Sequence, residues 1–507
     1  MRVLALSYHH LPSHLKLCFL YFAIFPEDKL IFVDKLVELC VVEGFLKVEE
    51  MKSTEEVAEN CLKELIDRSL ISIHRSRFDG KIESCGMHDV IRELCLREAQ
   101  NMNFVNILGE KGDQNPCGES IHFSSMSRGR ISIQLNMSDL IIEKISGRYP
   151  NNEIHSIICF RKHWYLPKLP FKLVRVVDLS LISLSAFPSL ILDLIHLRYL
   201  SLSLYPGLEI CRGEEVPSSI DIPQPVSSLC YVQTFILKLS PNEAWKYPFI
   251  LPLEILTMPQ LRHLNLDWNY LRKHELTEKW LGLKNLHSLS GWNPRYCTGS
   301  LFRLFPNINK LQICGTPEDF HSHKDLYDFL YLDQLKELEF CLTMERKRQY
   351  TGLAPAESLL LPPANAFPQN LKKLSFSQTY LRWKDLSIVS KLPKLEALTL
   401  TYDACIGEEW EGVDEGFPRL KFLLLDYLDI RFWRASSDHF PCLERLFLDC
   451  CWNLDSISLD FADITTLALI DIRGSQSAWN SAKQIQQDMQ DNYASSVELH
   501  IRPALKW

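Results

Sequence analysis

Apolar residues recur along most of the chain in a fixed order, in which one apolar residue is followed by two variable residues, a second apolar residue, one variable residue and a third apolar residue. Clear copies lie at residues 174–179, 197–202, 261–266, 308–313, 335–340, 371–376, 395–400, 420–425 and 443–448, and weaker copies begin at 154, 229, 286 and 467. The last five copies begin at 371, 395, 420, 443 and 467, at intervals of 24, 25, 23 and 24 residues. A strand of this pattern, repeated every 20–29 residues or so, is typical of leucine-rich repeats. The pattern therefore predicts a leucine-rich repeat solenoid, a horseshoe of α/β class, over residues 151–507.

Side chains alternate along a strand, so the positions on either side of the central apolar residue should face solvent on the concave surface. The residues at these positions that we predict to contact a partner are Tyr199, His263, Lys310, Glu337, Lys373, Phe422, Leu424, Arg445 and Phe447. Aromatic residues beside arginine are favoured in protein-binding hot spots. The alternative is that the C-terminal segment, predicted as a helix over residues 478–490 and a strand over 497–501, covers the last of them.

Two further features of the repeats carry structural predictions. Small polar or thiol side chains follow several strands, where they should satisfy the backbone of the turn; these are Asn269, Thr343, Thr379 and Cys451. The interval from residue 335 to residue 371 is 36 residues long and contains three prolines within residues 347–366, which predicts a loop insertion there.

Residues 1–100 follow a different pattern. Helical spacing of apolar residues, with stops at proline or glycine, predicts helices over residues 3–11, 12–25, 33–42 and 90–100. Ser53 and Glu56 have the spacing of a capping box, which predicts another helix that ends near Arg68. The alternating segments 70–74 and 81–85, joined by Asp79-Gly80, predict a β-hairpin. Helices followed by a hairpin indicate a winged-helix subdomain. The less periodic residues 101–150 are predicted to be a linker, with a strand over residues 127–133 that begins the next domain.

Composition and charge narrow the possible partners. Hydrophobic residues make up 46% and charged residues 23% of the 507, as in globular proteins. Winged helices often bind DNA, but residues 1–100 contain 13 Lys and Arg against 17 Asp and Glu, so we expect no nucleic-acid partner. The longest apolar run, residues 17–25, is about half of a membrane span. The start of the chain lacks a signal-peptide pattern and the 16 cysteines are scattered, so we expect reduced thiols in the cytoplasm or nucleus.

An ordered series of short segments resembles the winged-helix subdomain of plant NB-ARC immune receptors. The series is Leu6-Ser7-Tyr8, Leu11-Pro12, Leu15-Lys16, Cys18-Phe19-Leu20-Tyr21, Phe25-Pro26-Glu27-Asp28, Glu43-Gly44-Phe45 and Met87-His88-Asp89. Phe22 and Cys40 stand where that family usually has Cys and Trp, replacements that an apolar core can absorb. With the repeats, nearly the whole chain is similar to the C-terminal part of coiled-coil type NB-ARC leucine-rich repeat disease resistance proteins.

The resemblance implies a role for Met87-His88-Asp89. In the family, the histidine of this motif contacts the phosphates of ADP, so His88 would sense the nucleotide while Met87 and Asp89 fix its pose. The alternative is that Asp89 caps the helix over residues 90–100 and His88 is an ordinary loop residue. The chain contains no Gly-x-x-x-x-Gly-Lys followed by Ser or Thr, so ADP or ATP is implied by the family only. We therefore expect poor nucleotide binding by this chain alone, as a fragment or shortened form of a receptor.

The resemblance also implies a function in plant defence and the hypersensitive response, with the repeats recognising a pathogen effector or a guarded host protein. Two alternatives stay open: a repeat scaffold without nucleotide switching, or a ubiquitin-ligase substrate adaptor, since Leu11-Pro12 before an apolar helix faintly resembles an F-box. The sequence shows no Gly-x-Ser-x-Gly motif, and His321 and His323 lack metal-site spacing, so no catalytic or metal-binding residue is predicted.

Overall fold

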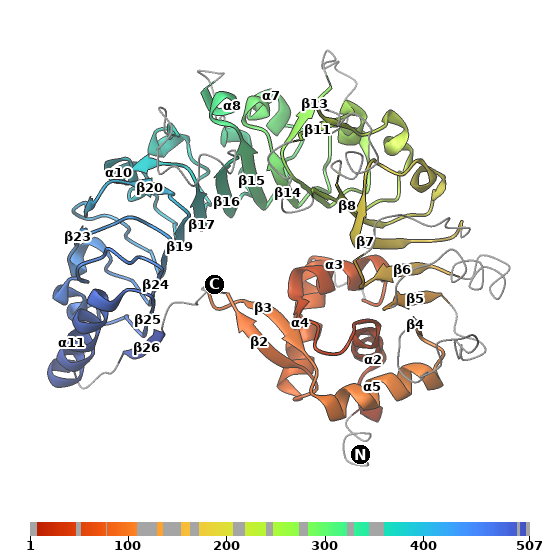
Figure 1. The fold of residues 1–507 in the computed structure, drawn as a ribbon, viewed down its shortest axis with the longest axis horizontal. Coiled ribbons are helices and arrows are strands. Elements are labelled where there is room, and N and C mark those ends of the chain that lie inside the picture. The colour runs from red at the N-terminus through yellow and green to blue at the C-terminus, as the bar shows by residue number, and fades with distance from the viewer. Residues whose placement is uncertain are drawn as a thin grey trace. The chain divides into compact units, whose positions relative to one another are not determined.

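The computed structural model of the protein describes residues 8–46, 52–77, 79–108, 129–134, 154–162, 172–205, 218–239, 247–272, 282–321, 329–343, 359–493 and 497–502. The chain divides into two compact units, residues 1–265 and residues 266–507. Figure 1 shows the helices and strands of each, coloured by residue number. Within the described ranges, no helix is both long enough and apolar enough to cross a membrane.

The first unit begins with a winged-helix fold. Its helices are α2 (Ser13–Tyr21), the 3₁₀ helix η1 (Phe22–Ile24), α3 (Val33–Glu43), α4 (Thr54–Asp67) and α5 (Asp89–Asn101). Its strands β1 (Ile31–Phe32), β2 (Ser72–Ser76) and β3 (Ile82–Gly86) form an antiparallel sheet in the order β1-β3-β2. The predicted hairpin is confirmed, whereas β1 is too short to have produced an alternating pattern. Residues 1–7, most of the predicted first helix, lie outside the described residues.

Local sequence signals set the ends of these helices. The side chain of Ser53 accepts a hydrogen bond from the Glu56 amide, and the Glu56 carboxylate accepts one from the Ser53 amide, both at 3.1 Å, which confirms the capping box. Helix α3 ends at Gly44, whose φ of 75° is easily adopted only by glycine. The two departures from the family pattern, Phe22 and Cys40, are both buried in the core.

The remainder of the first unit is a parallel sheet in the order β12-β10-β8-β7-β6-β5-β4. Its strands are β4 (Asn106–Leu108), β5 (Arg130–Ile133), β6 (Ser156–Cys159), β7 (Val176–Leu184), β8 (Tyr199–Leu204), β10 (Thr234–Leu239) and β12 (His263–Leu266). Two of these strands, β4 and β5, lie within residues 101–150, which the sequence predicted to be a linker. Strand β5 confirms the strand predicted over residues 127–133, whereas β4 has three residues and is too short to display the repeat pattern. The rest of 109–150 apart from 129–134 lies outside the described residues.

The second unit contains a parallel sheet in the order β14-β15-β16-β17-β19-β22-β24-β25-β26. Its strands are β14 (Ser288–Trp292), β15 (Lys310–Gly315), β16 (Glu337–Leu342), β17 (Lys373–Ser377), β19 (Ala397–Thr401), β22 (Phe422–Asp426), β24 (Arg445–Asp449), β25 (Leu469–Arg473) and β26 (Glu498–Arg502). Most strands begin two residues after the first apolar residue of a predicted copy, which confirms the repeat fold. The exception in the first unit is β10, which begins five residues after Leu229 because Leu229 belongs to the preceding turn.

Short elements connect the strands of both sheets. The helical ones are η2 (Ser189–Asp193), η5 (Gln224–Ser228), η6 (Leu253–Thr257), η7 (Pro294–Tyr296), α7 (Gly299–Phe302), α8 (Pro317–His321), η8 (Phe329–Tyr331), η9 (Ala364–Ala366), η10 (Trp383–Asp385), α10 (Leu386–Val389), η11 (Ser437–His439), η12 (Leu459–Asp463) and α11 (Gln476–Tyr493). The short strands are β9 (Ile220–Asp221), β11 (Phe249–Leu251), β13 (Asn269–Leu271), β18 (Leu381–Arg382), β20 (Cys405–Ile406), β21 (Glu409–Glu411) and β23 (Phe432–Arg434). Most of the predicted insertion over residues 347–366, namely residues 347–358, lies outside the described residues.

Three of the predicted turn residues do satisfy backbone groups. The Asn269 amide donates to the carbonyl oxygens of Asp267 and Gly291, and the Thr379 hydroxyl donates to the carbonyl of Ala404 at 2.8 Å. The Cys451 thiol lies 3.6 Å from the carbonyl oxygen of Leu425, a weak hydrogen bond consistent with its prediction as a structural thiol.

Candidate functional site

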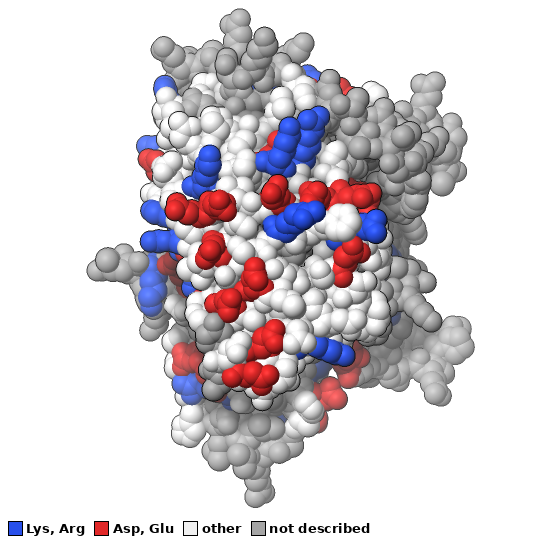
Figure 2. Space-filling view, turned by 90° about the vertical axis from the view of Figure 1, so that its left-hand side faces the viewer, with Lys and Arg blue, Asp and Glu red and all other residues white. Residues whose placement is uncertain are grey.

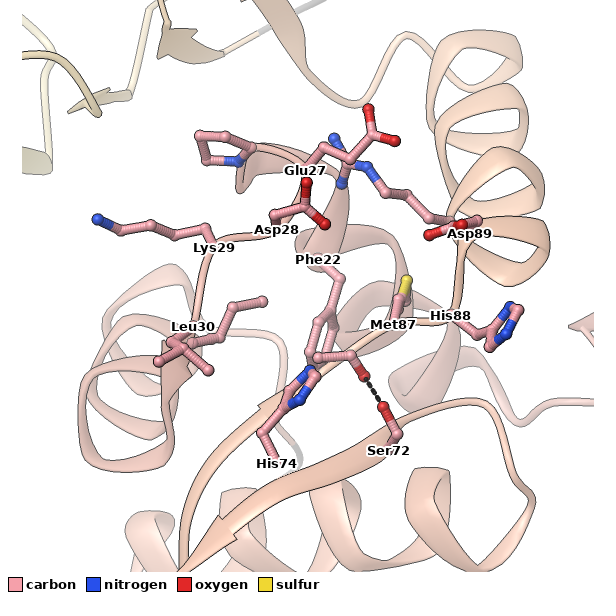
Figure 3. A pocket seen from close by; sticks show the side chains of 14 residues that line it. Phe22, Glu27, Asp28, Lys29, Leu30, Ser72, His74, Met87, His88 and Asp89 are labelled. Carbon is pink, nitrogen blue, oxygen red and sulfur yellow. Dashed lines mark hydrogen bonds between the residues drawn. The ribbon is translucent and has the colours of Figure 1, made fainter. Parts of the chain in front are cut away.

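The Met87-His88-Asp89 motif connects strand β3 to helix α5. His88 is the N-cap residue of α5, but its side chain makes no capping hydrogen bond, and Asp89 is the first residue inside the helix. The alternative in which Asp89 is the capping residue is therefore wrong, because the N-cap position is one residue earlier, at His88. The Asp89 carboxylate, in the first turn, still interacts favourably with the helix dipole. His88 and Asp89 are exposed, and the His88 ring points outward, away from Phe22 and His74 (Figure 3).

The motif lines a cavity of about 330 Å³ between the hairpin, α5 and the loop after η1. Its lining residues are Phe22, Pro26, Glu27, Asp28, Lys29, Leu30, Ile31, Ser72, His74, Gly86, Met87, His88, Asp89 and Arg92. Acidic side chains outnumber the two basic ones, and the Arg92 guanidinium already donates to the carbonyl of Phe25 at 3.0 Å. Ser72 likewise donates to the Gly86 carbonyl at 3.2 Å (Figure 3). By itself the cavity does not fit a diphosphate, which needs clustered donors and positive charge.

The other face of the winged helix packs on the first repeat strands, and the Glu43 carboxylate makes several contacts in this interface. Glu43, the last residue of α3, pairs with Arg130 of β5 at 2.8 Å and accepts a hydrogen bond from the Ser156 hydroxyl of β6 at 2.5 Å. The Glu43 side chain is only 5% exposed. The Arg130 guanidinium also lies over the rings of Phe45 and Phe104, at 5.0 and 4.4 Å. These contacts join α3 to strands that are distant in sequence (Figure 1).

Two more ion pairs connect the winged helix to repeat strands. Lys35 of α3 pairs with Asp178 of β7, whose side chain is fully buried. Glu55 of α4 accepts hydrogen bonds from Arg262 at 2.8 and 2.6 Å, and lies 3.2 Å from the His263 ring nitrogen. Although burial raises the pKa of Glu55, its hydrogen bonds to His263 and Arg262 outweigh burial and hold that pKa well below its ordinary value.

Two residues that were predicted to bind a partner, Tyr199 and His263, lie in this interface. The prediction for Tyr199 is wrong. Tyr199 is completely buried in a core that includes residues of the winged helix, so it does not face solvent on a concave surface. Burial, followed by the charge of Asp178, raises the pKa of its hydroxyl far above the ordinary value. His263 is half-buried against Glu55 and therefore serves an internal contact. The sequence did not predict the interface contacts of Glu43, Glu55 and Asp178. The one signal in the sequence was for Asp178, a charged residue in the middle of an apolar strand.

In the second unit, the remaining predicted residues fall into two groups. Glu337 lies between Lys310 and Lys373, with ion-pair distances of 3.5 and 3.3 Å, because the three residues are in register on adjacent strands. On later strands, the Arg445 guanidinium lies 5.6 Å from the centre of the Phe422 ring.

The second group is Phe422, Leu424, Arg445 and Phe447, and the prediction that Leu424 faces solvent is wrong. Phe422 and Phe447 are half-buried, but Leu424 is only 5% exposed, since its neighbours cover it. The C-terminal segment does not lie over this group within the described residues: β26 extends the sheet beside β25, and α11 packs against η12.

Comparisons with known proteins agree with this architecture. Residues 24–95 match the disease resistance protein winged helix domain. Late blight resistance protein homolog R1B-12 of Solanum demissum is 32% identical over 528 aligned positions, which cover 98% of this chain and 36% of that protein. Late blight resistance protein R1-A of the same species is 30% identical, with 97% of this chain and 37% of that protein covered. The chain is homologous to plant disease resistance proteins. It spans only about a third of the length of these relatives.

The winged-helix fold accounts for the segment that faintly resembled an F-box. Leu11 is buried and α2 is packed in the core of the winged-helix fold, so Leu11-Pro12 and the helix that follows belong to this fold and not to an F-box.

Among solved structures, the alignment with the leucine-rich repeat protein LIC12759 of Leptospira interrogans covers 72% of this chain and 95% of that protein, at 14% identity and a TM-score of 0.34.

The Glu55 contact predicts an acid-sensitive interface in this resistance protein homologue. Because the pKa of Glu55 is depressed in the folded state, its contribution is complete above the ordinary carboxyl pKa of 4.5 and is lost as the pH falls through the lower folded value. At pH 7 we expect the Glu55→Gln variant to be less stable by about 2 kcal/mol. Urea unfolding from pH 7 to pH 3 measures whether this difference shrinks in acid; a constant difference would contradict the prediction.

Proposed function

We propose that this chain is the winged-helix and repeat portion of a plant immune receptor that recognises a pathogen effector or a guarded host protein through its repeats. The observation that carries the proposal is homology to resistance proteins over 98% of the chain. The full receptor would act in the cytoplasm, and its nucleotide-binding half would hold ADP or ATP.

In this proposal, Met87-His88-Asp89 faces the nucleotide-binding half. His88 is exposed at the edge of a cavity, its side chain caps no helix, and its ring points away from the winged-helix core (Figure 3). Because the His88 side chain forms no capping hydrogen bond within the part of the chain that the structure describes, the ring is available to a second domain. The cavity itself lacks a phosphate-binding loop, so the phosphates would be held by the other half, with His88 donating to them and Met87 and Asp89 positioning it.

Substituting His88 tests this arrangement. The part of R1-A that this chain does not cover would be loaded with fluorescently labelled ADP and mixed with this chain. We expect the chain to slow ADP dissociation, and the His88→Ala variant to dissociate ADP about tenfold faster, the effect of one lost charge-assisted hydrogen bond.

A matched control is His10→Ala, since His10 is also an exposed histidine of the winged-helix region but lies outside the cavity. It should leave the ADP dissociation rate unchanged. Equal rates for His88→Ala and the unsubstituted chain, in a complex that does form, would show that His88 is not a nucleotide contact.

A further inference from the structure

A row of aromatic side chains lies beside the ends of the concave strands of the second unit. Tyr402, Tyr427 and Trp452 follow β19, β22 and β24; the two tyrosine rings stack at 5.3 Å, and Trp452 meets Tyr427 edge-on at 5.4 Å. Tyr402 is 51% and Trp452 is 55% exposed. Large aromatic rings with this exposure, arranged as a continuous row, form a surface suited to contact with another molecule.

The row is held in place by the repeat backbone. Tyr402 and Tyr427 both have left-handed φ angles, 50° and 51°, and their amides donate to the carbonyls of Asp426 and Asp449, each at 3.0 Å. The same backbone conformation occurs at Gln378 and Cys450 in neighbouring repeats, so it comes from the turn of the repeat. At this turn position, two repeats carry a tyrosine, Tyr402 and Tyr427, where the neighbouring repeats carry Gln378 and Cys450.

One carboxylate beside the aromatic row, that of Asp426, has no ion-pair partner among the described residues. Asp426 and Asp449 are in register on adjacent strands, and Asp449 pairs with Arg473 of β25 at 3.0 Å. Asp426 forms no ion pair among the described residues, and its Oδ1 atom is buried without a hydrogen-bond partner in them. A carboxylate that is partly buried without an ion-pair partner is costly. Because Asp426 as a whole is only half-buried, a cation supplied from outside would pair with this carboxylate through its more exposed side and reduce that cost.

An apolar surface continues from this carboxylate along the strands. Phe422 of β22 and Phe447 of β24 are half-buried and form this surface, and the covered Leu424 lies in register with Phe447 beneath it. At the far end of β22, Arg445 lies over Phe422. Asp426 is four residues beyond Phe422, a separation of roughly 13 Å at the usual rise of a strand. The surface therefore has an acidic, aromatic end, an apolar middle and a basic end.

We propose that this surface, formed by Tyr402, Tyr427, Trp452, Asp426, Phe422 and Phe447, binds a protein segment that places an arginine or lysine side chain against Asp426 and apolar side chains against the two phenylalanines. The inference rests on the proposed function, and it names the site on the repeats and the chemistry of the partner. The cation would pair with the Asp426 carboxylate, while its methylene stem would pack on the tyrosine stack, as basic side chains do on aromatic rings.

Binding of such a segment should depend on pH. The titratable and charged groups facing Asp426 are Asp449, Arg473, Tyr402, Cys450 and Cys451. Burial and the negative charge of Asp449 raise the pKa of Asp426 to about 6, against a lowering by Arg473. Because only the ionised carboxylate attracts a cation, affinity should fall as the pH is lowered from 7 to 5.

The outer side of the same repeats, which carries β20 and β23, is a competing surface for basic segments. Figure 2 shows acidic side chains spread over much of this side, with lysine and arginine gathered mainly in its upper part. Acidic residues exposed there include Glu408, Glu411 and Glu415. A test must therefore separate binding at Asp426 from general attraction to these acids.

The experiment pans a phage-displayed library of random twelve-residue peptides against the full chain, followed by calorimetric titration of the selected synthetic peptides at pH 7 and pH 5. We expect selected peptides to contain Arg or Lys near Leu or Phe, and to bind Asp426→Asn and Trp452→Ala at least tenfold more weakly. Glu411→Gln, which removes one charge from outer strand β21, should bind like the unsubstituted chain. The fall in affinity at pH 5 should disappear in Asp426→Asn.

Other outcomes overturn the inference. Selected peptides that lack a basic residue, that bind Asp426→Asn as well as the unsubstituted chain, or that respond equally to Glu411→Gln would each do so, as would a library that yields no binder. Thermal unfolding of each variant identifies a misfolded protein, and the pH dependence of the unsubstituted chain gives an answer that needs no substitution. Failure here would leave the His88 experiment unaffected, so the proposed function can be judged separately.

Discussion

Replacing Glu43 by alanine is expected to destabilise the first unit by about 3–5 kcal/mol, because it leaves the Arg130 guanidinium without its carboxylate partner in a largely buried position. The Ser156 hydroxyl loses its acceptor in the same step. We further expect the winged helix to separate from β5 and β6 before the rest of the unit unfolds. Urea unfolding, combined with hydrogen exchange of the β6 amides, measures both effects.

The exposed pair between Glu64 and Arg68 of α4 provides the control. Both of its side chains are 43% exposed, so Glu64→Ala should cost only a few tenths of a kcal/mol, as is usual for surface pairs. A Glu43→Gln variant removes the negative charge but keeps the size of the side chain and an oxygen that can accept a hydrogen bond. It therefore distinguishes the loss of the charge from the loss of the side chain. If Glu43→Ala were no more destabilising than Glu64→Ala, the contacts of Glu43 would contribute no more to stability than an exposed pair does.

Replacing Gly291 by alanine is expected to destabilise the second unit by more than about 2 kcal/mol. Gly291 has a φ of 74°, and an added Cβ would lie 2.1 Å from the carbonyl oxygen of Leu266 and 2.9 Å from that of Asp267. Its own carbonyl accepts from the Asn269 amide, so a backbone shift that relieved the clash would also disturb this turn residue. Thermal unfolding with hydrogen exchange in β14 measures the loss.

A substitution at Gly44 distinguishes the two causes of that loss, the left-handed backbone conformation and the steric clash of the added Cβ. Its φ is 75°, but no atom lies within 4 Å of an added Cβ, so Gly44→Ala carries the backbone cost without a clash. We expect Gly44→Ala to cost about 1 kcal/mol. Similar losses in the two variants would mean that the strand backbone around Gly291 can move aside.

The sequence by itself determined the elements and their order. Apolar spacing placed most strands of both sheets within two residues, since a strand needs buried side chains at alternate positions whatever surrounds it. The capping box at Ser53, the stop at Gly44 and the turn at Asp79-Gly80 are equally local, because each depends on atoms within a few residues. The same local signals placed His88 at the start of α5, whereas the cavity beside it was seen only in the structure.

Only the tertiary structure decided which of the predicted surface positions are free. Alternation shows which face of the sheet a side chain points from, but not what covers that face. Tyr199 and His263 were predicted from the same rule as Lys310, yet the winged helix covers the first strands and buries Tyr199 completely. Glu43 and Arg130 are 87 residues apart, and Arg473 of β25 forms its ion pair with Asp449 of the adjacent strand β24. Such pairings depend on the packing of distant segments, which no local pattern specifies.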